Sequence, residues 1–358
     1  MILTKILEAS GGRREAHAII TVDDSSLSFE RQLDGILSQY RELTDSVLPG
    51  MCPVFHRVFL SDSANQQSGV MERIGFTASV VEQAPLNLTK IALWVWMIED
   101  AKVKSVSSGR YIVEALGHRH LFETGRCRPG MSPSDAMHSI LTATGEELAE
   151  RGGSLLKNCV RTWLFVRDID MEYAGVVKGR NRAFEESGLT AKTRFIASTG
   201  IGGRQADSTV SVVCDTYSVF GLEEEAMCQI NAPSHLNPTY EYGVAFERAT
   251  RVDYADRSHL FVSGTASIDN RGNVVWDGDI RRQTVRMWEN VGALLEAASF
   301  HWEDLGQILV YLRDPADYAV VKGMFDERFP DIPFIILHAS VCRPGWLVEM
   351  ECMAMRKR

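Results

Sequence analysis

The chain has 358 residues, of which 45% are hydrophobic and 24% charged, and a formal net charge of -9. This acidic balance argues against a nucleic-acid-binding protein, because neutralising phosphates needs clustered Lys and Arg. The seven cysteines are odd in number and lack C-x-x-C spacing, as is typical of reduced thiols in a cytoplasm. No apolar run reaches the roughly 18 residues of a membrane span, and the first residues lack a signal-peptide core. We therefore expect a cytoplasmic protein that does not enter a membrane.

The first hundred residues combine apolar runs typical of strands with segments of helical spacing. Their expected order is strand, helix, strand, helix, strand, strand. These elements are expected at 15–24, 28–45, 53–62, 63–74, 77–84 and 90–99.

The rest of the chain twice follows the order strand, strand, helix, strand, helix, strand, strand. In the middle part the elements are expected at 107–117, 119–125, 132–153, 158–168, 171–187, 193–199 and 208–219. In the last part, after a first strand beyond residue 240, they are expected at 259–269, 279–299, 305–314, 315–329, 334–341 and 346–355. Pro315 and Asp317 suit the start of a helix.

An internal repeat organises these elements. The stretch LFVRDIDMEYAGVVKG, from Leu164, returns as ILVYLRDPADYAVVKG, from Ile308. The segment VFLSD, from Val58, matches VYLRD more loosely, so the first part joins the series mainly through its element order. We predict three units, at 1–102, 103–230 and 231–358. The alternative is two units after an unrelated N-terminal extension.

A single β-β-α-β-α-β-β unit has helices on one face of its sheet and leaves the other face uncovered. Three copies in one chain can cover one another around an internal pseudo-threefold axis. The predicted fold class is therefore α+β, with tandem units arranged as a pseudo-trimer. Such a chain needs no threefold association, and we expect it to be a monomer or a dimer.

The last unit resembles the Rid family, also called YjgF or imine deaminase, whose members are homotrimers with ligand sites between subunits. The resemblance lies in FVSGTASI at 261–268, VYLRDPADYAVVKGMFDERF at 310–329 and LVEMECMAM at 347–355. The last two units together resemble chorismatases, which are Rid-like enzymes that cleave pyruvate from chorismate. That likeness rests on VRTW at 160–163, FIASTGIGG at 195–203, FERA at 246–249 and VCRPGWLVEME at 341–351. Chorismatases usually carry Pro-Arg-Ser before the FERA position, whereas this chain has YEYGVAFERA, so one expected carboxylate-binding arginine is missing.

The resemblance implies that Glu349 is the acid of the site. Burial in a largely apolar strand raises the pKa of a carboxyl, which suits a proton donor near neutrality; the alternative is a solvent-facing strand glutamate. Alignment of the closing strands places Ser211 at the matching position of the middle unit and an apolar residue in the first. Only the last unit keeps the acid, so we expect one working cleft, between the second and third units.

The substrate-binding residues follow the same resemblance. Arg343 and Arg248 are the expected carboxylate-binding cations, and a surface turn is the alternative for Arg343. The arginine that Rid proteins use as a clamp is absent from the last unit near residues 334–336, whereas the middle unit has Arg194. The expected pocket lining is Cys342, Gly264, Thr265 and Ala266.

These residues favour chorismatase-like hydrolysis or elimination on a carboxylated enol ether such as chorismate. One alternative is an imine or enamine deaminase of the general Rid type, in which Glu349 positions the hydrolytic water. The other is a non-catalytic small-molecule-binding protein, to which the family's older label of translation inhibitor or endoribonuclease would then have been attached. In each case the expected partner is a small carboxylated metabolite, without metal, organic cofactor or nucleic acid.

Overall fold

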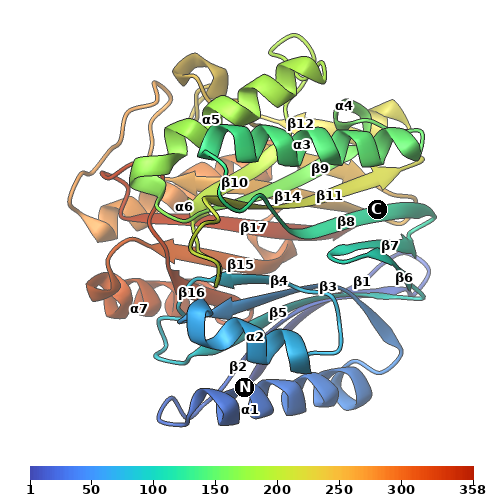
Figure 1. Ribbon diagram of the computed structural model, residues 1–358, viewed down its shortest axis with the longest axis vertical. Coiled ribbons are helices and arrows are strands. Elements are labelled where there is room, and N and C mark those ends of the chain that lie inside the picture. The colour runs from blue at the N-terminus through green and yellow to red at the C-terminus, as the bar shows by residue number, and fades with distance from the viewer.

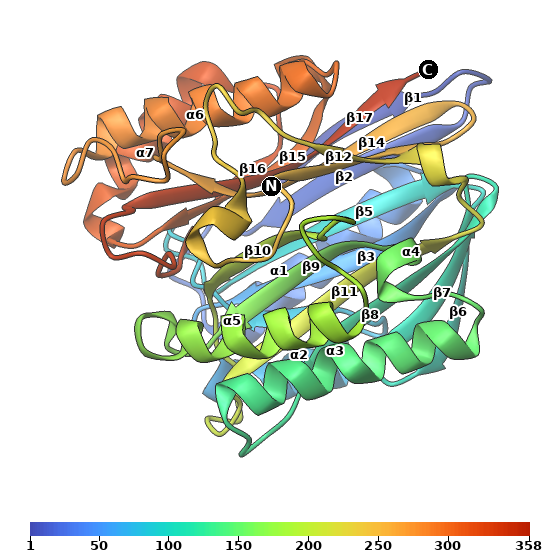
Figure 2. The same ribbon diagram turned by 90° about the horizontal axis from the view of Figure 1, so that it is seen from above.

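The computed structural model describes residues 1–358, apart from the side chains of Glu241 and Tyr242. Three sheets, one from each part of the chain, carry helices on their outer sides (Figure 1). In Figure 2, helices α6 and α7 lie on one side of the molecule, α3 and α5 on the other, and strands fill the space between them. The predicted α+β pseudo-trimer of three repeated units is confirmed.

The first sheet has the strand order β1-β2-β5-β3-β4 and is covered by two helices. Its elements are β1 (Ile2–Glu8), β2 (Arg14–Thr21), α1 (Phe29–Glu42), a π-helical turn (Leu43–Val47), β3 (Met51–Leu60), α2 (Ser63–Arg73), β4 (Ser79–Glu82) and β5 (Ile91–Glu99). Strand β1 was not predicted from the sequence. It forms an edge hairpin with β2, turning at Gly11 and Gly12, whose positive φ angles of 98° and 82° favour glycine.

The second sheet has the order β10-β9-β11-β8-β7-β6, and its helices α3 and α5 pack against each other. Its elements are β6 (Lys102–Ser107), β7 (Arg110–Ala115), β8 (His118–Cys127), α3 (Pro133–Glu150), α4 (Leu155–Asn158), β9 (Cys159–Val166), α5 (Ile169–Glu186), β10 (Ala197–Gly202) and β11 (Val212–Phe220). A Cβ at Gly179 would lie 2.1 Å from the carbonyl oxygen of Ser134, so glycine is required where α5 crosses α3.

The third sheet has the order β12-β13-β14-β17-β15-β16. Its strands are β12 (Met227–Ile230), β13 (Ala249–Asp253), β14 (Arg257–Ala266), β15 (Leu305–Leu312), β16 (Phe334–His338) and β17 (Val348–Lys357). Its helices are α6 (Ile280–Ala297) and α7 (Tyr318–Arg328), and short 3-10 turns occur at Glu224–Ala226, Thr239–Tyr242, Trp302–Asp304 and Pro315–Asp317. The helix expected from Pro315 thus begins as a 3-10 turn, which Asp314 caps by accepting a hydrogen bond from the Ala316 amide.

The inner faces of the three sheets share one core. Phe55 of the first sheet stacks on Trp163 of the second at 5.8 Å, and Trp96 of the first meets Phe261 of the third at 6.2 Å. Strands β9 and β15 are buried along their whole length, because helices cover one face and the other two units cover the second. Each unit therefore covers the sheet faces that the other two leave open.

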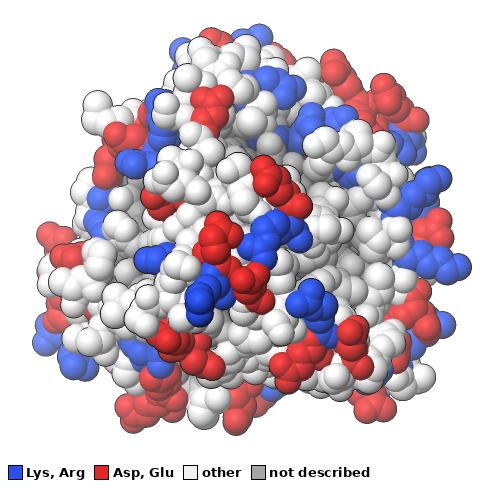
Figure 3. Space-filling model, turned by 60° about the horizontal axis from the view of Figure 1, so that its bottom comes forward, with Lys and Arg blue, Asp and Glu red and all other residues white. Residues whose placement is uncertain are grey.

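On the face shown in Figure 3, acidic and basic side chains alternate, and no continuous basic stripe crosses it. Among the described residues, no helix is long and apolar enough to cross a membrane.

Candidate active site

A cavity of about 370 Å³ lies between the second and third units. Helix α5 and strand β10 form one wall, β14 and β17 form the other, and the loops at 243–248 and 342–346 close it. Its lining residues are Ile169, Asp170, Tyr173, Ala174, Val177, Arg180, Ser198, Gly200, Gly243, Val244, Phe246, Arg248, Gly264, Ala266, Ile268, Cys342, Arg343, Trp346 and Glu349. Most of the residues that the sequence predicted for the site are thus found together.

Glu349 is the buried acid of this cavity, with 4% of its surface exposed. Strand β17 holds it between Ala266 of β14 and Tyr311 of β15. Its carboxyl lies against Gly264, where a Cβ would come within 2.2 Å of Oε1, so a larger residue would displace it. Burial, followed by the negative charge of Glu351, raises the pKa of Glu349 to about 8. The carboxyl is therefore largely protonated at neutral pH, as a general acid requires.

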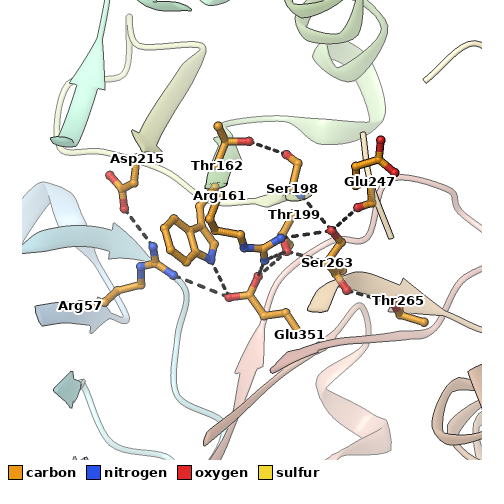
Figure 4. A network of polar contacts seen from close by, with 12 residues as sticks. Arg57, Arg161, Thr162, Ser198, Thr199, Asp215, Glu247, Ser263, Thr265 and Glu351 are labelled. Carbon is orange, nitrogen blue, oxygen red and sulfur yellow. Dashed lines mark hydrogen bonds and ion pairs between the residues drawn. The ribbon is translucent and has the colours of Figure 1, made fainter. Parts of the chain in front are cut away.

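Glu351 lies two residues further along β17 and is held by a buried network (Figure 4). Its Oε2 lies 2.6 Å from Nη2 of Arg161 and also accepts from the Thr199 hydroxyl, while its Oε1 accepts from Trp163 Nε1 at 3.0 Å. Arg57 of the first unit comes within 3.7 Å of Oε1. The network joins all three units.

Arg343 and Arg248 both line the cavity, as predicted, and each is held in place by backbone and ring contacts. Arg343 donates from Nη1 to the Gly272 carbonyl at 2.8 Å and lies over the Trp346 ring at 4.7 Å. Arg248, which is 4% exposed, donates from Nη2 to the Asn237 carbonyl at 3.0 Å. Arg343 lies in the bend before β17, is partly exposed, and lines the cavity from this loop.

A third arginine of the cavity, Arg180, was missed in the sequence. It belongs to α5 and is 1% exposed. The signal was present in the helix pattern, because Val176, Gly179, Arg180 and Ala183 form one buried stripe of α5. An arginine within an apolar helix stripe requires a specific polar environment. The cavity thus brings together the protonated carboxyl of Glu349, the carboxylate of Asp170, which pairs with Arg313, and three guanidinium groups.

The predicted small residues are divided by the alternation of β14. Gly264 and Ala266 line the cavity, whereas Thr265 faces away from it, with its hydroxyl donating to the Ser263 carbonyl. The prediction that Thr265 lines the pocket was therefore wrong.

Cys342 does line the cavity, and burial, together with the charge of Glu349, raises the pKa of its thiol to about 12. A neutral thiol is a poor nucleophile, which agrees with the lining role.

Arg194 was wrongly predicted to bind substrate. Its guanidinium donates to the carbonyls of Leu156, Phe195, Leu155 and Cys159, at 2.7 to 3.2 Å, and it does not line the cavity. These bonds satisfy the carbonyls around the short helix α4, so its role is structural.

Ser211 was also wrongly matched to Glu349. The amides of Arg167 and Arg313 donate to the carbonyls of Ser211 and Leu347, so these two residues are counterparts. In the third unit, Glu349 pairs with Tyr311 of the neighbouring strand. The equivalent position is Val213, opposite Phe165, in the second unit and Ala92, opposite Phe59, in the first. The expectation that only the last unit keeps the acid still holds, because neither counterpart ionises.

Comparisons with known proteins agree with this architecture. The family model of endoribonuclease L-PSP matches residues 246–356. A protein of Streptomyces hygroscopicus named 3-hydroxybenzoate synthase is 27% identical over 286 residues, which cover 73% of this chain and 81% of that protein. A RutC family protein of Saccharolobus solfataricus is 35% identical over 99 residues, which cover 27% of this chain and 79% of that protein. A crystal structure of a chorismatase superposes with a TM-score of 0.70 at 17% identity, covering 97% of this chain and 99% of the other.

Proposed function

The chain belongs to the RutC family of the Rid/YjgF superfamily and is chorismatase-like, and we propose that its cleft cleaves pyruvate from chorismate or a closely related carboxylated enol ether. The observation that carries this proposal is the protonated carboxyl of Glu349 in a cavity that also holds three arginines. The names of the similar synthase and chorismatase support the substrate class.

The charge of the cavity suits a small dianion. Chorismate has two carboxylates, one on its ring and one on its enolpyruvyl side chain. The three guanidinium groups of the cavity are enough to pair with both. Guanidinium binds carboxylate through two parallel hydrogen bonds, which fixes the orientation of the substrate as well as its charge. Arg180 compensates in this proposal for the cation that the missing Pro-Arg-Ser stretch would supply.

In the proposed mechanism, Glu349 gives its proton to the terminal methylene carbon of the enol ether. The double-bond electrons form the new C–H bond, and the adjacent carbon becomes an oxocarbenium ion. Water adds there and loses a proton, which restores the neutral Glu349. The hemiketal then breaks its bond to the ring oxygen, which takes up a proton, so that chorismate and water yield pyruvate and a ring diol.

A second course consumes no water overall. Loss of pyruvate with aromatisation of the ring converts chorismate into a hydroxybenzoate, the product class in the name of the Streptomyces hygroscopicus relative. Both courses share the protonation by Glu349 and the release of pyruvate. The ring product therefore reports which course follows the common first step.

The test is incubation of the purified protein with chorismate and, separately, with freshly generated 2-aminoacrylate. We expect pyruvate and a ring product from chorismate, with Glu349→Gln as the matched inactive control. Accelerated ammonia release from 2-aminoacrylate, without turnover of chorismate, would instead identify a deaminase. Inertness toward both substrates would reject the proposed reaction in favour of a binding protein.

A further inference from the structure

A buried network of charged side chains surrounds Glu351, next to the residues that line the cavity. Arg57, Arg161, Asp215 and Glu351 have side chains that are at most 2% exposed, although all four are ionisable. Isolated charges at such depth cost several kcal/mol each, by order of magnitude, so their pairing is required for folding. Pairing explains why these groups tolerate burial, but it does not explain why they lie beside the acid of the cavity.

The network reaches Glu349 through the backbone. The Thr199 hydroxyl donates to Glu351 and accepts a hydrogen bond from the Gly264 amide at 2.9 Å. Gly264 is the residue against which the carboxyl of Glu349 lies. Glu351 thus anchors, through a single side chain, the strand segment that positions the neighbouring acid.

The charges of the network are balanced without Glu349. Arg57 lies 3.0 Å from Asp215 and 3.7 Å from Glu351, and Arg161 lies 2.6 Å from Glu351. Two cations therefore face two carboxylates, and an ionised Glu349 would add a third negative charge. The N-terminal unit, which has Ala92 at the position of the acid, contributes Arg57 to this balance.

We propose that Glu351 is a positioning residue for Glu349, which it holds against Gly264 through Thr199 and keeps in the proton-bearing form by its own charge. This inference rests on the proposed role of Glu349 as proton donor. The high pKa of Glu349, which Glu351 helps to raise, is consistent with it. The other titratable or charged groups that line the cavity with Glu349 are Asp170, Tyr173 and Arg180 on α5, Arg248 before β13, and Cys342 and Arg343 in the loop before β17. Arg161 on β9 and Tyr311 on β15 also interact electrostatically with Glu349.

The test is a ¹³C NMR titration of protein labelled at the glutamate side-chain carboxyl, with Glu349→Gln to assign the resonance. Glu351→Gln keeps the shape of the side chain but removes its charge. We expect the titration midpoint of the Glu349 carboxyl to fall by at least about one pH unit, because the negative charge of Glu351 is lost and Arg161 is released from its ion pair with Glu351. An unchanged midpoint in a folded variant would overturn the proposal.

Asp215→Asn is the matched control. By strand register, Asp215 occupies in the second unit the position of Glu351 in the third, and it also pairs with Arg57. Its loss should lower the melting temperature, and it should shift the titration midpoint of Glu349 much less than Glu351→Gln does, because Glu351 and not Asp215 bonds to Thr199 and acts directly on Glu349. An equal shift in both variants would mean that the net charge of the network, and not Glu351 itself, sets the protonation of Glu349, which would overturn the proposal.

Thr199→Val is the second variant, for use if Glu351→Gln does not fold. It removes the hydroxyl that links Glu351 to the Gly264 amide and leaves every charge of the network in place. We expect kcat on chorismate to fall about tenfold with KM nearly constant, as for a misplaced general acid. An unaltered kcat would overturn the positioning role. Since the NMR titration needs no substrate, a shifted midpoint without chorismate turnover would reject the proposed function and keep this inference.

Discussion

Glu349→Gln is expected to lower activity and to raise stability at the same time. The amide has nearly the shape of the carboxyl but cannot donate an acidic proton, so kcat should fall by about 10²–10⁴-fold. In the wild type, the pKa of Glu349 rises from 4.5, its ordinary value, to about 8 in the folded state. The folded protein therefore retains a proton that the unfolded chain has lost, and its stability declines as pH rises through this window.

The size of the decline follows from the same shift. One pKa unit corresponds to 1.36 kcal/mol, so between about pH 4.5 and pH 8 the wild type should lose about 4 kcal/mol that the Gln variant keeps. The wild-type kcat should likewise fall as pH rises through about 8, because Glu349 then ionises.

The assay is urea denaturation of both proteins at about pH 5 and about pH 8, with chorismate kinetics alongside. All other titrating groups are common to the two proteins, so the change in their stability difference isolates Glu349. Parallel pH dependences would refute the proposed protonation of Glu349 in the folded state. Full activity of the variant would refute its role as the acid.

Three further predictions concern the other residues of the site. Arg343→Lys keeps the charge but loses the planar fork, so KM for chorismate should rise about tenfold in steady-state kinetics, with kcat nearly constant. Arg194→Met should lower the free energy of unfolding by about 3 kcal/mol in urea, because buried carbonyls lose their donors, and an increase in KM would contradict its structural role. Iodoacetamide at about pH 8 should leave Cys342 unmodified by mass spectrometry, because a thiol whose pKa is raised to about 12 is almost entirely protonated there; rapid alkylation would show a thiolate.

Several features of the site were predictable because each lies within a short stretch of sequence. Glu349 and Arg343 belong to one segment of the last unit, and the resemblance to chorismatases covers that segment without a gap. Local periodicity also identified the long helices and the central strands, because their apolar patterns are strong, whereas the short helix α4 was not predicted. The edge strand β1 was missed, since its single partner and exposed side leave a weak pattern.

The errors arose where the outcome depends on contacts between segments that are distant in the sequence. Ser211 was mismatched by two positions because the closing strand was aligned by itself, whereas hydrogen bonds to the neighbouring strand determine its register. Arg194 resembles a substrate clamp in sequence but turns to the carbonyls near α4. Arg57 gave no functional signal, because its partners Asp215 and Glu351 are far along the chain.

The sequence by itself determined the repeated unit and the α+β class, because both follow from local patterns of residues. It also determined that only one unit keeps the acid, because this follows from comparing the units with one another. The tertiary structure alone decided that Arg180 joins the predicted arginines in the cavity and how the proton of Glu349 is held. Those properties depend on burial and on charge separations of a few ångströms between segments from different units. Because desolvation and Coulomb interactions act through space rather than along the chain, the packing of the three units sets the chemistry of the cleft.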